Sequence, residues 1–264
     1  MLMKLVKYDL KWTMKVILVF ISLGFILSVL GRLFSLIEDS LFFSIVTAIF
    51  NGAGLSMFIT ALFNSIIRGW VRFVLNLYKD ESYLTHTLPI NKSTLYLAKV
   101  ISVIISIIIT CVALLIGVVI MYYSKENLEV VKESLNTIST ILDSSVIGFL
   151  LLCFFIVLLE AIFIVLCGYF GIIVGHLFNK RKILMSVLFG LGIYFVGTII
   201  SLLVMLVSSV FNEGLYGIIF GGTTNIEFSM LVVILWIGVV LYSLYNFALY
   251  FIGNKLFNKG VNVE

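Results

Sequence analysis

Six apolar runs, each longer than about 18 residues, constrain the fold of this chain more than any other feature. A helix that crosses the hydrocarbon core of a membrane needs about 20 predominantly apolar residues. Each run therefore predicts one transmembrane helix, and together they predict an all-α membrane protein. The predicted spans cover residues 14–37, 41–67, 100–123, 146–177, 183–211 and 229–253.

The composition of the chain supports this interpretation and excludes a water-soluble domain. Of its 264 residues, 62% are hydrophobic and 11% are charged. Soluble domains contain about 45–50% apolar and about 25% charged residues. Six spans and their connections leave no room for a soluble domain, so we expect residues 1–264 to form a single transmembrane domain. The first apolar run is too long for a signal peptide and ends without a cleavage site, which predicts a retained span.

The distribution of positive charge between the spans predicts the orientation in the membrane. Fourteen of the seventeen Lys and Arg residues fall in the N-terminal segment, the connections after the second and fourth spans, and the C-terminal tail. Segments rich in Lys and Arg stay on the cytoplasmic side. We therefore expect a cell-membrane protein with both termini in the cytoplasm. The same clustering relates the net charge of +4 to the membrane and its lipid, and argues against binding to nucleic acid.

Two outer connections have patterns of their own. Between the third and fourth spans, apolar residues recur at steps of three and four, which predicts an amphipathic helix on the outer face. A polar loop is the alternative there. Segment 212–229, before the last span, is rich in glycine yet apolar, and either a re-entrant element or a plain loop fits it. The apolar positions of the amphipathic segment are Leu128, Val131, Leu135, Ile138 and Leu142.

The sequence lacks the motifs of common enzymes and metal sites. It holds no G-x-x-x-x-G-K-[ST] phosphate-binding loop, no H-E-x-x-H motif, no G-x-S-x-G motif and no Cys/His cluster. The two histidines, His86 and His176, occupy positions that suit solvated or interfacial roles. We therefore expect that this chain carries out no enzymatic chemistry and binds no metal or cofactor of its own.

One acidic residue, Glu160, lies near the middle of a predicted span. An ionised side chain at that depth costs about 2.5 to 3.5 kcal/mol on insertion scales, so it faces a cavity, pairs with a partner or stays protonated. Two interpretations stay open: a polar spot on a translocation route, or a protonated carboxyl group that holds two helices together. The candidate partners from the second and sixth spans are Asn51, Asn64 and Asn246.

The cytoplasmic connection after the second span has the most detailed local signal. Asp80 or Ser82 can cap a short helix that continues to about Thr87. Pro89 ends this helix because the residue before a proline, here Leu88, is disfavoured in the α conformation. The pattern predicts a short helix followed by a sharp break.

A second helix is predicted to start near Asn91 and to continue into the third span. A short helix that projects at the inner membrane face suits docking to a soluble partner. The alternative is an ordinary interfacial helix, with Arg68 and Arg72 in contact with lipid phosphates.

Residues 79–102, KDESYLTHTLPINKSTLYLAKVIS, resemble the ABC-2 class of ATP-binding-cassette exporter permeases of Gram-positive bacteria. Those permeases carry an acidic, aromatic, Leu-Thr and Leu-Pro stretch between their second and third spans, followed by a polar turn. The predicted six spans, cytoplasmic termini and re-entrant element agree with the same outline. The matching residues are Asp80, Glu81, Tyr83, Leu84, Thr85, Leu88 and Pro89, followed by 91–97.

The resemblance implies a coupling helix over 80–90, including His86, that docks into a groove of a separate ATPase subunit. It also implies two ATPase copies, which hold ATP and Mg²⁺, and a second permease copy that is identical or a close paralogue. The implied cargo is amphipathic or antimicrobial-type peptides. Two other functions stay open: a proton-coupled secondary transporter that uses Glu160, or a membrane scaffold or sensor without a substrate.

Overall fold

The computed structural model is all-helical and forms two compact units, Met1–Val130 and Val131–Asn262. Every regular element among the described residues is a helix, which confirms the all-α class. Six helices are long and apolar enough to cross a membrane, as expected of a multi-pass membrane protein. The single transmembrane domain expected over 1–264 stays a prediction. The described residues are 1–37, 40–79, 81–87, 89–123, 129, 133, 146–221 and 228–259.

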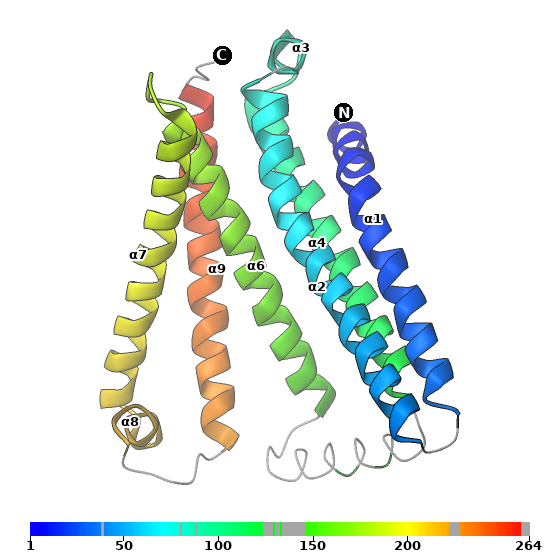
Figure 1. Cartoon of the computed structure of the whole chain (residues 1–264). Helices are drawn as coiled ribbons and strands as arrows, with labels where there is room; N and C mark the ends of the chain where they lie inside the picture. Colours follow the sequence, from blue (N-terminus) through cyan, green and yellow to red (C-terminus); the bar gives the residue numbers. More distant parts are fainter. Residues whose placement is uncertain are drawn as a thin grey trace. The chain divides into compact units, whose positions relative to one another are not determined.

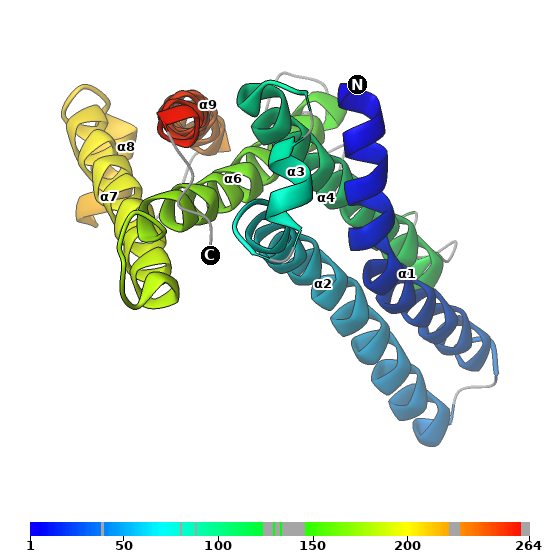
Figure 2. The same cartoon turned by 90° about the horizontal axis from the view of Figure 1, so that it is seen from above.

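In the first unit, three long helices pack against one another along their length (Figure 1). They are α1 (Leu2–Phe34), α2 (Leu41–Leu77) and α4 (Lys92–Tyr122). The short α3 (Ser82–Thr87) connects α2 to α4 and lies at their ends when the bundle is seen from above (Figure 2). This end of the unit also carries the N-terminus.

The core of the first unit forms where one face of each long helix meets the other two. On α1, buried residues recur every three or four positions from Val6 to Gly31, so a single face of a continuous helix packs inward. The ring of Phe58 lies fully buried at the centre and meets Phe25 edge to face at 5.1 Å. The buried core residues are Ile17, Ile21, Phe58, Ala61, Ala113 and Met121.

The helices of the first unit extend beyond the apolar runs that predicted them. α1 begins at Leu2 instead of near residue 14, and α2 continues to Leu77 instead of ending near residue 67. The charged flanks of these runs remain helical because Lys, Arg and Leu are good helix formers. With 37 residues, α2 is about 55 Å long, so it must tilt in or protrude from a hydrocarbon core of about 30 Å.

In the second unit, α6 packs against both α7 and α9. The fourth, fifth and sixth predicted spans correspond to these three helices within a few residues, except that α9 continues to Lys259. The bounds are Val146–Gly175 for α6, Lys182–Val210 for α7 and Phe228–Lys259 for α9.

The segment before the last span begins with a short helix, α8 (Glu213–Phe220). The side chain of Asn212 caps this helix by accepting hydrogen bonds from the main-chain nitrogens of Gly214 and Leu215. Gly221, at φ 77°, ends it in the left-handed conformation that glycine adopts without strain. Whether segment 212–229 re-enters the membrane is not tested, so the re-entrant element stays a prediction. The outer amphipathic segment around 128–142 lies almost entirely outside the described residues.

Gly171 allows α6 and α7 to approach closely. A Cβ atom at this position would lie 2.6 Å from the main-chain nitrogen of Gly190, and main-chain atoms have no rotamer with which to move away. Gly192, on α7, has open space around the same position. The two glycines therefore form a matched pair of sites.

We predict that Gly171→Ala lowers the free energy of unfolding by about 1–3 kcal/mol, because the added methyl group forces the two helices apart. Gly192→Ala should leave the free energy of unfolding unchanged or raise it by up to about 1 kcal/mol, because alanine has a higher helix propensity than glycine. Thermal unfolding of both variants in the same detergent checks this. Equal shifts in the two variants would contradict the close contact.

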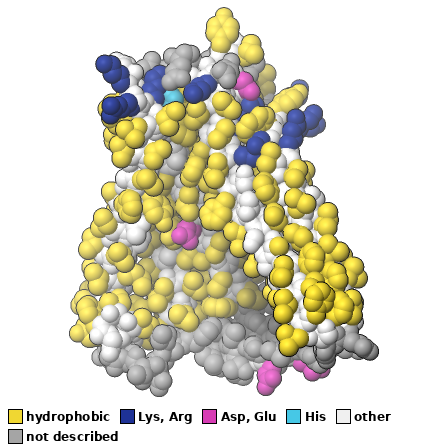
Figure 3. Space-filling view, viewed as in Figure 1, with side chains coloured by type: hydrophobic (Ala, Val, Ile, Leu, Met, Phe, Trp, Pro, Cys, Tyr) yellow, Lys and Arg dark blue, Asp and Glu magenta, His cyan; other side chains and the backbone are white. Residues whose placement is uncertain are grey.

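Charged and apolar side chains separate along the length of each unit. On the face seen in Figure 3, Lys and Arg side chains lie at one end of each unit, and hydrophobic side chains cover most of the remaining length. In the first unit, the charged end is the one that carries α3 and the N-terminus. An apolar surface of this length suits contact with lipid. The cytoplasmic position of the charged ends stays a prediction.

Candidate functional site

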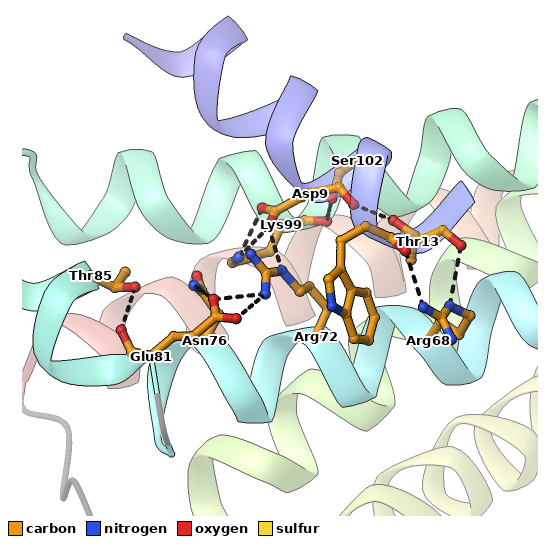
Figure 4. Close-up of polar contacts among 10 residues, drawn as sticks. Asp9, Thr13, Arg68, Arg72, Asn76, Glu81, Thr85, Lys99 and Ser102 are labelled. Carbon is orange, nitrogen blue, oxygen red and sulfur yellow. Dashed lines mark hydrogen bonds and ion pairs between the residues drawn. The ribbon is translucent and has the colours of Figure 1, made fainter. Parts of the chain in front are cut away.

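Two acidic and two basic side chains form ion pairs at the end of the first unit that carries α3 (Figure 4). We call them the charge cluster: Asp9 of α1, Arg72 of α2, Glu81 immediately before α3, and Lys99 of α4. Two acids and two bases balance within this group. The cluster thus ties the three long helices and the base of α3 together.

Asp9 is the centre of the buried part of the cluster. Lys99 Nζ donates to both carboxylate oxygens of Asp9, at 2.7 and 2.8 Å. Arg72 Nε donates to Asp9 Oδ1 at 2.9 Å. Asp9 and Lys99 are each only 4% exposed. Burial of two charges is tolerable only with such close pairing, so α1 is held firmly against α2 and α4.

Glu81 forms the outer part of the cluster and anchors α3. Arg72 Nη1 donates to both oxygens of Glu81, at 2.8 and 2.7 Å, and Asn76 Nδ2 donates to one of them at 2.8 Å. Desolvation opposes ionisation of this group, but the hydrogen bonds from Arg72 and Asn76 outweigh it and lower the pKa of Glu81. Glu81 therefore remains ionised and attached to α2 near neutral pH.

α3 presents two apolar side chains to the outside. Tyr83 is 78% exposed and Leu84 is 69% exposed, whereas Ser82 and Thr85 are buried on the opposite side of the helix. Thr85 Oγ1 donates to the main-chain oxygen of Glu81 at 2.9 Å, which links the helix to its anchor. One side of this short helix therefore packs against the rest of the unit, and the other side exposes apolar side chains.

Arg68 lies beside the cluster and contacts α1 as well. Its Nη2 donates to the main-chain oxygen of Trp12 at 3.0 Å, and its Nε donates to that of Thr13 at 3.2 Å. The guanidinium group stacks on the Trp12 ring at 4.2 Å from its centroid. Both Arg68 and Arg72 thus have partners on α1, and their contact with lipid phosphates stays a prediction.

Of the eight predicted coupling residues, the structure describes the side chains of four on α3 or directly before it. Glu81, Tyr83, Leu84 and Thr85 have the positions described above. Ser82 is the first residue of α3 and not its cap. Asp80, Leu88 and the side chain of His86 lie outside the described residues, and Pro89 follows α3 as an exposed bend.

The predicted polar residues within the spans divide between the two units. In the second unit, Asn246 Nδ2 donates to the main-chain oxygen of Leu159, next to Glu160, at 2.9 Å. Asn51 and Asn64 belong to the first unit. Asn64 Nδ2 donates to the main-chain oxygen of Thr60 in its own helix, and Asn51 is buried against α1. Any pairing of Asn51 or Asn64 with Glu160 stays a prediction.

Asp9, the central residue of the cluster, was not among the site residues predicted from the sequence. A signal for it does exist: Asp9 shares a helical face with Thr13 and Ile17 at steps of four, opposite the exposed lysines of the same segment. The expectation of a solvated His176 was wrong, whereas its position at the membrane interface stays a prediction. This residue is 3% exposed, and its Nδ1 lies 2.8 Å from the main-chain oxygen of Ile172.

The geometry of the charge cluster suits a structural role, in which it fixes α3 to the three long helices, better than a catalytic one. Each charged group has an oppositely charged partner within 3 Å, and none stands free to attack or to exchange a proton with a substrate. In the part of the chain that the structure describes, no group of three His, Cys, Asp or Glu residues could hold a metal. No protein-family profile, curated protein or solved structure matches the chain.

Proposed function

We propose that the chain is the transmembrane permease subunit of an ATP-driven exporter of the ATP-binding-cassette type, and that α3 is its coupling helix. The observation that carries the proposal is the pair of exposed apolar side chains, Tyr83 and Leu84, on a short helix anchored to a buried charge cluster. An apolar pair of this kind fills a groove of a protein partner. Through the charge cluster, a displacement of α3 would be transmitted to the three long helices.

In this function, a separate ATPase supplies the energy and binds ATP and Mg²⁺, because the sequence has no phosphate-binding loop. Two ATPases and two permease copies form the transporter. In the same proposal, both termini and α3 lie in the cytoplasm with the ATPase, and the excess of Lys and Arg in these segments supports that orientation. The cargo is an amphipathic or antimicrobial-type peptide, as the family resemblance implies.

The test is co-purification of ATP hydrolysis with the tagged chain from native membranes. We predict that Tyr83→Ala/Leu84→Ala reduces the vanadate-sensitive hydrolysis that co-purifies by about tenfold or more, since apolar anchors dominate such interfaces. The matched control is Leu36→Ala/Tyr123→Ala, which removes exposed side chains of the same two types at the opposite end of the unit. Undiminished hydrolysis with the α3 variant would reject the assignment of α3.

A proton-coupled secondary transporter is a second candidate, and a contact of Glu160 favours it. The Tyr242 hydroxyl and the Glu160 carboxyl group interact electrostatically, so two ionisable side chains meet within the spans. This candidate predicts transport that a pH gradient drives without ATP and that Glu160→Gln abolishes. The permease hypothesis, by contrast, predicts no transport in the absence of ATP.

A further inference from the structure

The second unit holds a polar and aromatic cluster midway along its three long helices. Glu160 lies at the middle of α6, and Tyr242 and Asn246 lie one turn apart on α9. Asn246 Nδ2 donates to the main-chain oxygen of Leu159, and the Tyr242 hydroxyl lies close enough to the Glu160 carboxyl group to interact with it electrostatically. These contacts bring Glu160 of α6 close to α9.

Two oxygen acceptors in this region need a donor. The Oδ1 atom of Asn246 is buried without a hydrogen-bond partner among the described residues, because the amide nitrogen already binds Leu159. All the ion pairs in the part of the chain that the structure describes belong to the charge cluster of the first unit, so Glu160 has none there. A carboxylate and an orphaned amide oxygen together call for a cationic N–H donor.

Aromatic rings line the same level of the unit. The Phe163 ring, one turn after Glu160 on α6, lies 5.7 Å from the ring of Tyr242 and 5.4 Å from that of Tyr245. Tyr194 of α7 completes the group at 5.9 Å from Phe163. Electron-rich ring faces attract organic cations, whereas Ca²⁺ or Mg²⁺ needs about six oxygen ligands, which this cluster does not supply.

We propose that this cluster is a binding site for an organic cation, either a primary ammonium or a guanidinium group, with Glu160 as its counter-ion. The Asn246 oxygen accepts a hydrogen bond from the cation, and the aromatic rings surround its apolar stem. This inference rests on the proposed function. If the chain is an exporter, the site selects cargo that carries a positive charge, and this charge binds at the level of Glu160 within the membrane.

The test uses probes of equal size and opposite charge. 3-Phenylpropylammonium and 3-phenylpropionate are titrated against the purified chain in nanodiscs of zwitterionic lipid, and binding is followed by saturation-transfer NMR. We predict that the ammonium probe binds about tenfold more tightly than the carboxylate probe, and that Glu160→Gln removes this preference. Glu160→Asp should keep the preference with lower affinity, and Glu129→Gln, which removes an exposed carboxylate elsewhere, should change nothing.

Equal binding of both probes, or an unchanged preference in Glu160→Gln with its unfolding midpoint preserved, would overturn the cation site. A second titration uses an amphipathic decapeptide with free lysines and the same peptide acetylated on them. Binding of the free peptide supports a peptide cargo, and binding of the ammonium probe alone supports a small organic cation. The ATPase is absent throughout, so Tyr83→Ala/Leu84→Ala should bind the probes normally even if the exporter assignment fails.

Discussion

Asp9→Asn should destabilise the first unit by about 3–5 kcal/mol, the usual loss when a buried ion pair is broken by removal of one partner. The substitution keeps the size of the side chain but removes its charge. Lys99 then remains 4% exposed and loses the carboxylate that it binds, and Arg72 loses one of its two carboxylate partners. We expect the thermal unfolding midpoint of the purified chain to fall by about 10 °C.

A double-mutant cycle separates the lost pairing from the lost packing. Asp9→Asn, Lys99→Met and the combination of both are compared in the same detergent. Because Lys99→Met removes the buried charge that Asp9→Asn deprives of its carboxylate, the double variant should be more stable than the sum of the single losses implies, by at least about 1 kcal/mol. Strict additivity would show that the two side chains do not depend on each other.

The transmembrane helices were predictable because their signal is local. A window of about 20 residues contains all the information that identifies a span, and the six apolar runs correspond to the six long helices. The ends of the helices were harder to predict. Hydropathy falls wherever a lysine appears, yet the helix continues, so α1 begins twelve residues before the predicted span. Pro89 marked the end of α3 well, because proline acts on its nearest neighbours.

The buried part of the charge cluster was not predictable in the same way, because the two pairs of Asp9 join residues 63 and 90 positions apart in the sequence. In the sequence, Arg72 and Lys99 look like any other positive charges at the ends of spans. Only the packing of α1 against α2 and α4 brings Asp9 between them. By contrast, the proximity of Asn246 to Glu160 followed partly from the depth of each residue in its own span.

Arg72→Lys should loosen α3 although it preserves every charge in the cluster. Arg72 donates through Nε to Asp9 and through Nη1 to Glu81, so one planar group bridges two carboxylates. A lysine ammonium is a single point on a flexible stem and cannot span both. Lys99 still neutralises Asp9, and Glu81 therefore loses its cation. Since the Glu81 side chain is 45% exposed, solvent screens this pair, and we expect about tenfold faster amide exchange in α3.

Hydrogen–deuterium exchange of peptides that cover 81–87 measures this effect, with Arg32→Lys as the control. Arg32 contacts only the Ser35 hydroxyl, at 3.4 Å, among the hydrogen bonds of the described residues, so the same exchange of side chains has little to disrupt there. Unchanged exchange in Arg72→Lys would mean that Asn76 and the helix itself hold α3. If α3 does loosen, the variant keeps Tyr83 and Leu84 for binding the ATPase, so binding should fall less than in the double alanine variant. ATP-driven transport should fall more than ATPase binding does, because a loosely attached α3 transmits less of its displacement to the three long helices.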